Sequence, residues 1–96
     1  MYLLVTYDIS TETPEGSRRL RHVCQACKDF GQRVQYSVFE FDLDEAQLEI
    51  LKHRLLELIE PNEDSIRIYR LRGKREEIVE SYGVDKYVDF DGPLFF

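Results

Sequence analysis

The feature that most constrains the fold of this chain is the alternation of extended apolar segments with two long helical patterns. The extended segments, rich in β-branched and aromatic residues, span 2–8, 32–43 and 65–71. Helical patterns lie between them, over residues 13–30 and 44–60. Strands that alternate with helices in so short a chain favour one sheet with both helices on one face. The sequence therefore predicts an α+β, ferredoxin-like βαββαβ sandwich.

Local signals mark the ends of both predicted helices. Thr13 is a good N-cap, Pro14 suits a first turn, and Gly31 is placed to end the first helix. Asp44 is a second N-cap, and Gln47 is placed to complete a capping box with it. The residues that recur at helical spacing form the expected buried stripes, which are Leu20, Val23, Cys24, Cys27 and Phe30, then Leu48, Leu51, Leu55 and Leu58.

The sequence does not decide the secondary structure of two segments. The ferredoxin-like fold needs two strands between its helices, yet residues 32–43 contain no Gly, Pro or Asn that would mark a turn. Either one long bent strand lies there, or a sharp kink falls near Ser37. Residues 75–83 fit a short helix or an edge strand. We expect one domain over residues 1–96, with a core in 1–72 and an apolar C-terminal extension in 73–96 that forms a homodimer.

The charge distribution bears on the choice of partner. A net charge of −6 argues against a simple nucleic-acid binder. The local pattern differs from the total, because Arg18, Arg21 and Lys28 share one face of the first helix and residues 65–75 contain basic but no acidic residues. Electrostatic binding depends on the local field, so two basic patches on an acidic body are compatible with phosphate binding.

Several classes of protein are disfavoured by simple criteria. No apolar run approaches the roughly 20 residues of a membrane span, and the N-terminus lacks the pattern of a signal peptide. Two cysteines are too few for a disulfide scaffold. We therefore expect a cytoplasmic protein that does not associate with a membrane.

The carboxylate at the end of the first predicted strand is the first candidate for chemistry. Asp8 follows an apolar run, and a buried carboxylate is unfavourable unless something pairs with it. Asp8 either starts a turn in water, is held by an Arg or a backbone N–H, or holds a metal ion. One carboxylate alone is a poor Mg²⁺ site, but two copies brought together by a two-fold axis would be adequate.

The C-x-x-C formed by Cys24 and Cys27 is weak evidence for zinc, because no second pair and no nearby His accompanies it. Both cysteines lie on the apolar stripe of the first helix. Buried small hydrophobic residues are therefore the favoured interpretation.

Three motifs in order, "YDIS", "RRLR" and "GQRVQYSVFE", resemble the small CRISPR-associated protein of the spacer-acquisition machinery. This family is a compact ferredoxin-like partner of the CRISPR integrase and is also described as a metal-dependent nuclease. The resemblance covers Met1 to about Leu71 in motif order and spacing. It implies a homodimer, a Mg²⁺ or Mn²⁺ cofactor and a nucleic-acid ligand, either DNA or RNA.

Carried over by position, the resemblance implies roles for individual residues. Asp8 would be the metal-binding and catalytic aspartate. Phosphate would be held by Arg19, Arg21 and Arg33. Supporting or packing positions would be Tyr7, Ser37 and Phe39.

Three functions stay open from the sequence. The chain could be an adaptor that grips nucleic-acid backbone for the integrase, or a metal-dependent endonuclease. A third hypothesis, from outside the family, is a small-ligand or regulatory ferredoxin-like module.

Overall fold

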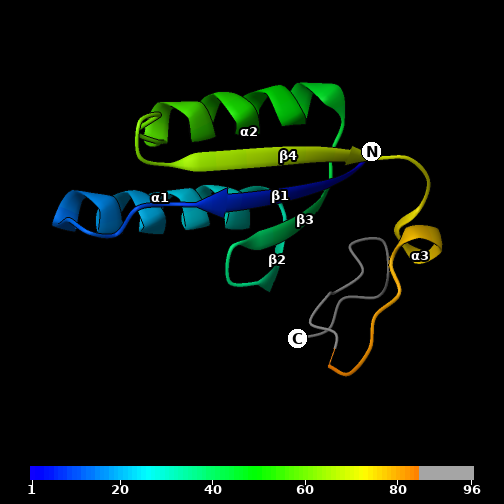
Figure 1. Cartoon of the computed structure of the whole chain (residues 1–96). Coiled ribbons are helices and arrows are strands. Elements are labelled where there is room, and N and C mark those ends of the chain that lie inside the picture. Colours follow the sequence, from blue (N-terminus) through cyan, green and yellow to red (C-terminus); the bar gives the residue numbers. More distant parts are fainter. Residues whose placement is uncertain (85–96) are drawn as a thin grey trace.

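The computed structural model describes residues 1–84, which form a four-stranded sheet, two long helices and one short helix (Figure 1). The elements in chain order are β1 (Tyr2–Asp8), α1 (Pro14–Phe30), β2 (Gln32–Gln35), β3 (Val38–Asp42), α2 (Glu45–Leu58), β4 (Ser65–Leu71) and α3 (Arg75–Ile78). The first six elements follow the order βαββαβ. The predicted α+β, ferredoxin-like fold is confirmed.

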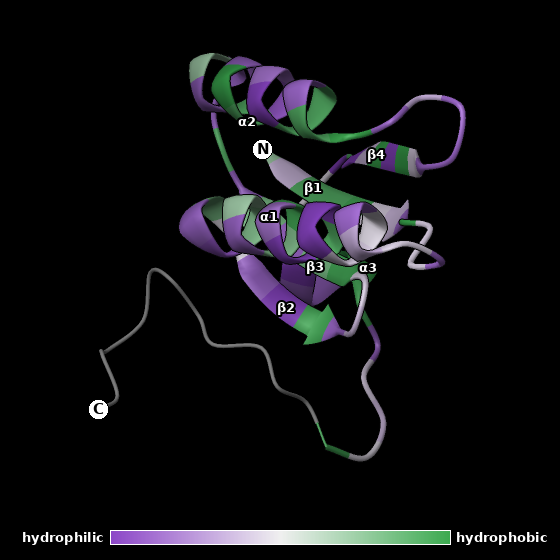
Figure 2. Cartoon of the chain, turned by 90° about the vertical axis from the view of Figure 1, so that its left-hand side faces the viewer, coloured by the Kyte–Doolittle hydropathy of each residue, from purple (hydrophilic) through white to green (hydrophobic). Residues whose placement is uncertain are grey.

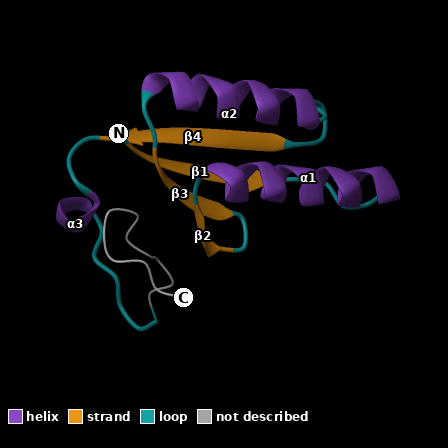
Figure 3. Ribbon diagram, turned by 180° about the vertical axis from the view of Figure 1, so that it is seen from behind, coloured by secondary structure: helices purple, strands orange, loops and turns teal. Residues whose placement is uncertain are grey.

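The sheet is antiparallel, with strand order β2-β3-β1-β4 and β1 in an inner position. Val5 lies opposite Phe39 on β3 and opposite Ile68 on β4. Both long helices lie on the same face of the sheet, as the view from behind shows (Figure 3). The other face of the sheet is not covered by α1 or α2.

The core lies between the sheet and these two helices. Side chains alternate across a strand, so every second residue of β1 and β3 points toward the helices. The strands contribute Leu3, Val5, Tyr7, Phe39 and Phe41, and the helices contribute Val23, Ala26, Cys27, Leu48, Leu51 and Leu55. Figure 2 shows the resulting contrast of hydrophobic and hydrophilic colour along the helices. The predicted stripes are confirmed, with Leu20, Cys24, Phe30 and Leu58 half-buried at their margins.

The caps predicted from the sequence are present. The Thr13 hydroxyl accepts a hydrogen bond from the backbone N–H of Gly16 at 3.1 Å. Asp44 and Gln47 form the complete capping box at the start of α2. Each satisfies backbone donors that the first helical turn leaves without intrahelical partners.

Gly31, the C-cap of α1, lies where the packing leaves no room for a side chain. Its N–H donates to the carbonyl oxygen of Cys27 at 2.8 Å. A Cβ at this position would lie 2.3 Å from the Phe41 ring and 2.5 Å from the carbonyl oxygen of Glu40. No larger residue fits without moving β3 away from the end of the helix.

Two strands, rather than one, occupy the segment between the long helices. A turn at Tyr36 and Ser37 separates β2 from β3, so the alternative of a sharp kink near Ser37 is confirmed. The pairing of the two strands is irregular between Arg33 and Gln35. This tight turn lies beside the end of β1 and positions the candidate site.

The segment after β4 contacts the sheet through a buried carboxylate. Glu40 is 5% exposed and accepts hydrogen bonds from the Tyr2 hydroxyl and from Arg75 Nε at 2.6 Å. Gly73, with φ of +97°, provides the left-handed turn before α3. Residues 75–78 are therefore the short helix that the sequence left open. The predicted strand exchange by "GPLFF" at residues 92–96 lies outside the described residues.

Candidate functional site

Asp8 is the last residue of β1 and is exposed. Strand alternation places it on the same face as Leu4 and Thr6, opposite the helices. On β3 the pairing with β1 ends at Val38, opposite Thr6, so Asp8 lies beyond the paired part of that strand. Within residues 1–84 its carboxylate makes no hydrogen bond or ion pair. Of the three alternatives raised by the sequence, an Arg or backbone N–H that holds the Asp8 carboxylate is therefore not found among residues 1–84.

A cavity of about 610 Å³ opens beside Asp8, between α1, the end of β1 and the turn from β2 to β3. Three cationic side chains line it, and Asp8 is the acidic residue among them. The lining comprises Tyr7, Asp8, Ile9, Leu20, Arg21, Cys24, Gln25, Lys28, Arg33, Tyr36 and Ser37. A polyanion such as a nucleic-acid backbone matches the sign of this surface.

The cations of the cavity come from two elements. Arg21 and Lys28 project from exposed positions two turns apart on α1. Arg33 comes from β2, and its guanidinium lies 5.5 Å from the centre of the Phe39 ring. The guanidinium also donates a hydrogen bond to the Cys24 sulfur. The contact with the aromatic ring and the hydrogen bond to Cys24 hold the planar guanidinium beside the cavity.

Tyr7 and Phe39 lie in the core beneath this site. Phe39 is fully buried, and its ring centre lies 6.1 Å from that of Tyr7. Burial, followed by the neighbouring Cys24 thiol, raises the pKa of Tyr7 to about 12, against a hydrogen bond from Arg33 that lowers it. The Tyr7 phenol is therefore protonated at neutral pH and supports the site by packing.

Ser37 borders the cavity and is half-buried. Its carbonyl oxygen accepts a hydrogen bond from the backbone N–H of Tyr7 at 3.2 Å. The Tyr7 hydroxyl also donates to the carbonyl oxygen of Tyr36 at 3.3 Å. The turn that carries Ser37 is thus bonded to the end of β1 at two points.

Arg19 differs from Arg21 in its surroundings, although both lie on α1. Its Nε donates to Oδ2 of Asp64 at 2.8 Å, and Glu63 lies 3.8 Å away. The Asp64 side chain is fully buried and also accepts the backbone N–H groups of Ser10 and Glu60. Arg19 is therefore engaged in holding the loop after β1 within the described residues, and its role in phosphate binding stays a prediction.

Burial of Asp64 raises its pKa, but the hydrogen bonds from Arg19, Glu60 and Ser10 outweigh burial and leave the pKa below its usual value. Asp64 is a residue that sequence reasoning missed. In "PNEDS" it resembles an ordinary loop acid, and no local signal distinguishes it from Glu63.

The two cysteines provide no metal site in the described structure. Both are free, Cys27 is buried, and Cys24 is half-buried. Burial, with Cys24 nearby, raises the pKa of Cys27 to about 12, so it stays a neutral thiol. No group of three or more His, Cys, Asp or Glu side chains within residues 1–84 could enclose an ion. A metal at Asp8 would consequently need ligands from outside this part of the chain.

Comparison with known proteins decides the family. The family model described as CRISPR associated protein Cas2 matches residues 1–78. The chain belongs to the Cas2 family. It is 60% identical over 94 residues to a protein of Moorella thermoacetica named CRISPR-associated endoribonuclease Cas2 1, covering 98% of each chain. It is 46% identical over 96 residues to one of Halalkalibacterium halodurans named CRISPR-associated endonuclease Cas2, covering 100% of each.

Solved structures agree with this assignment. The crystal structure of Streptococcus pyogenes Cas2 at pH 6.5 superimposes with a TM-score of 0.77 at 51% identity, covering 86% of this chain and 100% of that one. Membership of the Cas2 family confirms the resemblance seen in the sequence. It also argues against the non-CRISPR regulatory module. Among residues 1–84, no helix of this Cas2 chain is long and apolar enough to cross a membrane.

Proposed function

We propose that this Cas2 chain is a metal-dependent endonuclease that binds the backbone of DNA or RNA. It would act as a homodimer in spacer acquisition, beside the CRISPR integrase subunit. The observation that carries the proposal is the exposed Asp8 carboxylate, unpaired within the described residues, on the rim of a cavity lined by three cations. A cytoplasmic location fits the free Cys24 and Cys27 thiols, which a reducing compartment preserves.

The residues at this position fit Mg²⁺ or Mn²⁺ in their chemistry. Both ions prefer oxygen ligands, and Mg²⁺ is commonly held by one or two carboxylates together with water and phosphate. Asp8 from each of two protomers would supply two carboxylates. When bound, such an ion provides charge neutralisation at the phosphate and a more acidic water.

The cationic side chains of the cavity would bind and orient the nucleic acid. Arg21, Lys28 and Arg33 would bind phosphate oxygens, and the two arginines can do so through two parallel hydrogen bonds. Their positive charge would also draw the polyanion toward an otherwise acidic protein. These contacts orient the backbone beside Asp8.

The face of the sheet opposite α1 and α2 supports the homodimer. Leu4, Thr6 and Val38 are half-buried there, and Tyr69 is 39% exposed. Asp8 shares this face, so a second copy packed on it would bring in a second Asp8. In addition, β4 pairs only with β1 within residues 1–84, which leaves an edge to which a strand could add. Strand addition by residues 92–96 remains a prediction.

An adaptor without nuclease activity is the second candidate. It is favoured by the incomplete metal site, because residues 1–84 of one chain present three cations but only one carboxylate at the cavity. In that case the cavity would bind backbone for the integrase, and Asp8 would have no catalytic role.

Metal removal separates the two candidates. RNA and DNA oligonucleotides incubated with the purified chain should be cut in Mg²⁺ or Mn²⁺ and left intact in EDTA, as judged on denaturing gels. Cleavage should increase with pH, because the attacking water must lose a proton. Binding without cleavage in any metal would favour the adaptor, and cleavage that persists in EDTA would contradict the metal site.

The salt dependence of binding tests the phosphate contacts proposed for Arg21, Lys28 and Arg33. Replacing Arg21 and Arg33 by Ala should weaken binding to all sequences alike. Each lost contact should reduce the slope of log K against log salt by about 0.9 for duplex DNA and about 0.7 for single strands. Arg72→Ala removes one positive charge outside the cavity, next to Leu71 at the opposite end of β1 from Asp8, and should reduce the slope less than the double variant does. A loss confined to one sequence would indicate base readout instead.

A further inference from the structure

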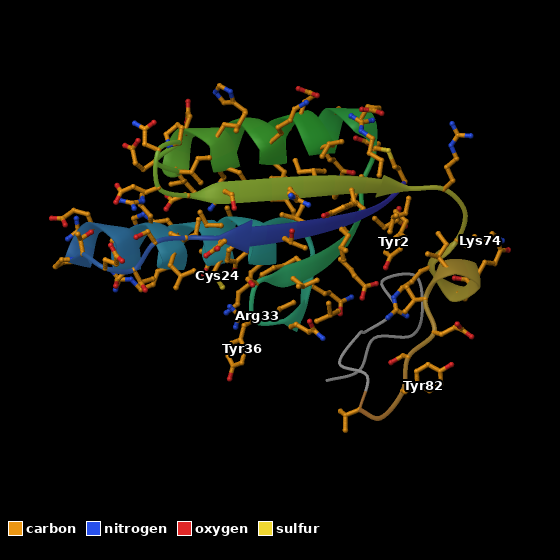
Figure 4. All side chains as sticks on the ribbon, viewed as in Figure 1. Tyr2, Cys24, Arg33, Tyr36, Lys74 and Tyr82 are labelled. Carbon is orange, nitrogen blue, oxygen red and sulfur yellow. The ribbon has the colours of Figure 1, made fainter. Side chains whose placement is uncertain are left out.

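Tyr36 is an aromatic side chain that neither the fold nor the proposed cleavage uses. It lies in the turn between β2 and β3 and is 90% exposed. In Figure 4 its ring points away from the body of the protein, below Arg33 and Cys24. Leaving so large a ring in water forgoes the stabilisation that its burial would provide. The exposed ring is therefore available for contact with a ligand.

The backbone beneath this ring is held in place. The Tyr7 hydroxyl bonds to the carbonyl oxygen of Tyr36, and the Tyr7 N–H bonds to that of Ser37. Immediately beside the turn, Gln35 pairs with Val38 across the two strands. Tyr36 is consequently displayed from a fixed support, which reduces the entropy lost when a ligand packs on the ring.

The surroundings of the ring indicate the chemistry of that ligand. Tyr36 lines the 610 Å³ cavity together with Arg21, Lys28 and Arg33. It also lines a second cavity of about 500 Å³, formed by residues 33–38. Cations that follow a backbone, together with an aromatic ring on which a base can stack, are the combination by which proteins bind single-stranded nucleic acid.

We propose that Tyr36 stacks on an unpaired nucleobase while Arg21, Lys28 and Arg33 hold the neighbouring phosphates. A base within a duplex is already stacked on both sides, so this contact selects single strands or frayed ends. The inference rests on the proposed function, because it assigns Tyr36 a role in binding at that site. Tyr36 is a specificity residue and takes no part in the chemistry at Asp8.

The test is a binding titration in EDTA, which prevents any cleavage. Fluorescein-labelled single-stranded oligonucleotides, a hairpin of equal length and an abasic strand of the same backbone are titrated and followed by anisotropy. Tyr36→Ala should weaken binding of the single strand about ten-fold, within the range measured for base–aromatic stacking. Binding of the abasic strand and the salt slope should not change, because no charge is lost.

Two variants control for the ring and for exposure. Tyr36→Phe keeps the aromatic face and should bind like the parent chain. Tyr82→Ala removes another exposed tyrosine, 84% exposed and outside the cavity, and should also bind like the parent. Thermal melting should be the same for all these chains, since neither ring is part of the core.

Four outcomes would overturn the proposal. Equal binding of the single strand by parent and Tyr36→Ala would show that no base stacks there, while leaving the proposed nuclease intact. An equal loss for the abasic strand would mean that the effect is not base stacking. A change from dimer to monomer in light scattering would assign the ring to contact between two copies. If the parent itself binds no oligonucleotide, the proposed function fails as well.

Discussion

Asp8→Asn is expected to abolish metal-dependent cleavage. The substitution keeps the shape of the side chain but removes the negative charge that would hold a divalent cation. Metal ions contribute several kcal/mol of transition-state stabilisation, and each 1.36 kcal/mol is a factor of ten in rate. We therefore expect a loss of at least about 10²-fold in the initial rate, measured on the preferred oligonucleotide at saturating Mg²⁺. Binding in EDTA should not weaken, because the phosphate contacts come from other residues.

Glu12→Gln is the matched control for that experiment. It removes one exposed carboxylate from the loop that follows β1, outside the lining of the cavity. Its cleavage rate should equal that of the parent. If Asp8→Asn cuts at the parent rate, Asp8 is not the metal ligand, whatever the outcome with EDTA.

The melting temperature gives a second measurement of the same site. Two Asp8 carboxylates that face each other in a metal-free dimer repel, so Asp8→Asn should slightly stabilise that dimer. Mg²⁺ should then raise the melting temperature of the parent more than that of the variant. Equal stabilisation of both by Mg²⁺ would rule out the paired-aspartate site.

Asp64→Ala is expected to destabilise the fold strongly. Its buried carboxylate accepts hydrogen bonds from Arg19 and from the backbone N–H groups of Ser10 and Glu60. Removing one partner of a buried network leaves the others unsatisfied, so we expect a loss of about 3 kcal/mol in the free energy of unfolding. For a domain of this size, that corresponds to a fall on the order of 15 °C in melting temperature.

The effect of Asp64 should depend on pH in a defined direction. Its pKa in the folded chain lies below the ordinary value, so it stabilises the fold fully above about pH 4. This contribution is lost as pH falls through the lowered pKa, because the protonated carboxyl binds Arg19 less well. The difference in stability between parent and Asp64→Ala, measured by urea unfolding, should therefore be constant near neutrality and shrink in acid.

Two further variants test whether the large loss of stability in Asp64→Ala comes from the burial of its ion pair with Arg19. Asp29→Ala breaks an exposed ion pair with Arg54, in which both side chains are 41% exposed, and should change stability far less. Arg19→Ala should lower the melting temperature in the same direction as Asp64→Ala. If Arg19→Ala instead leaves stability unchanged and flattens the salt slope of binding, Arg19 contacts phosphate, as the family resemblance implies.

Much of the fold could be predicted because its signals are local. The caps at Thr13 and Asp44 act within three residues of themselves, and the stripes of α1 and α2 repeat within each helix. The strands β1 and β4 were apparent from their composition and the loops around them. The turn at Tyr36 and Ser37 was only one of two alternatives, because residues 32–43 contain no Gly, Pro or Asn and the turn is hydrogen-bonded to Tyr7 on a distant strand.

The sequence by itself determined the order of elements, the helix ends, the family motifs and the choice of Asp8 as the central candidate. Only the tertiary structure separated Arg19 from Arg21, which are identical residues two positions apart on one helix. The deciding partner of Arg19 is Asp64, 45 residues further along the chain. The structure also brought Tyr36 to the same cavity as Arg21, Lys28 and Arg33. The physical reason is that burial and pairing of a charged group depend on which distant segments the fold brings together, and periodicity within one helix carries no information about them.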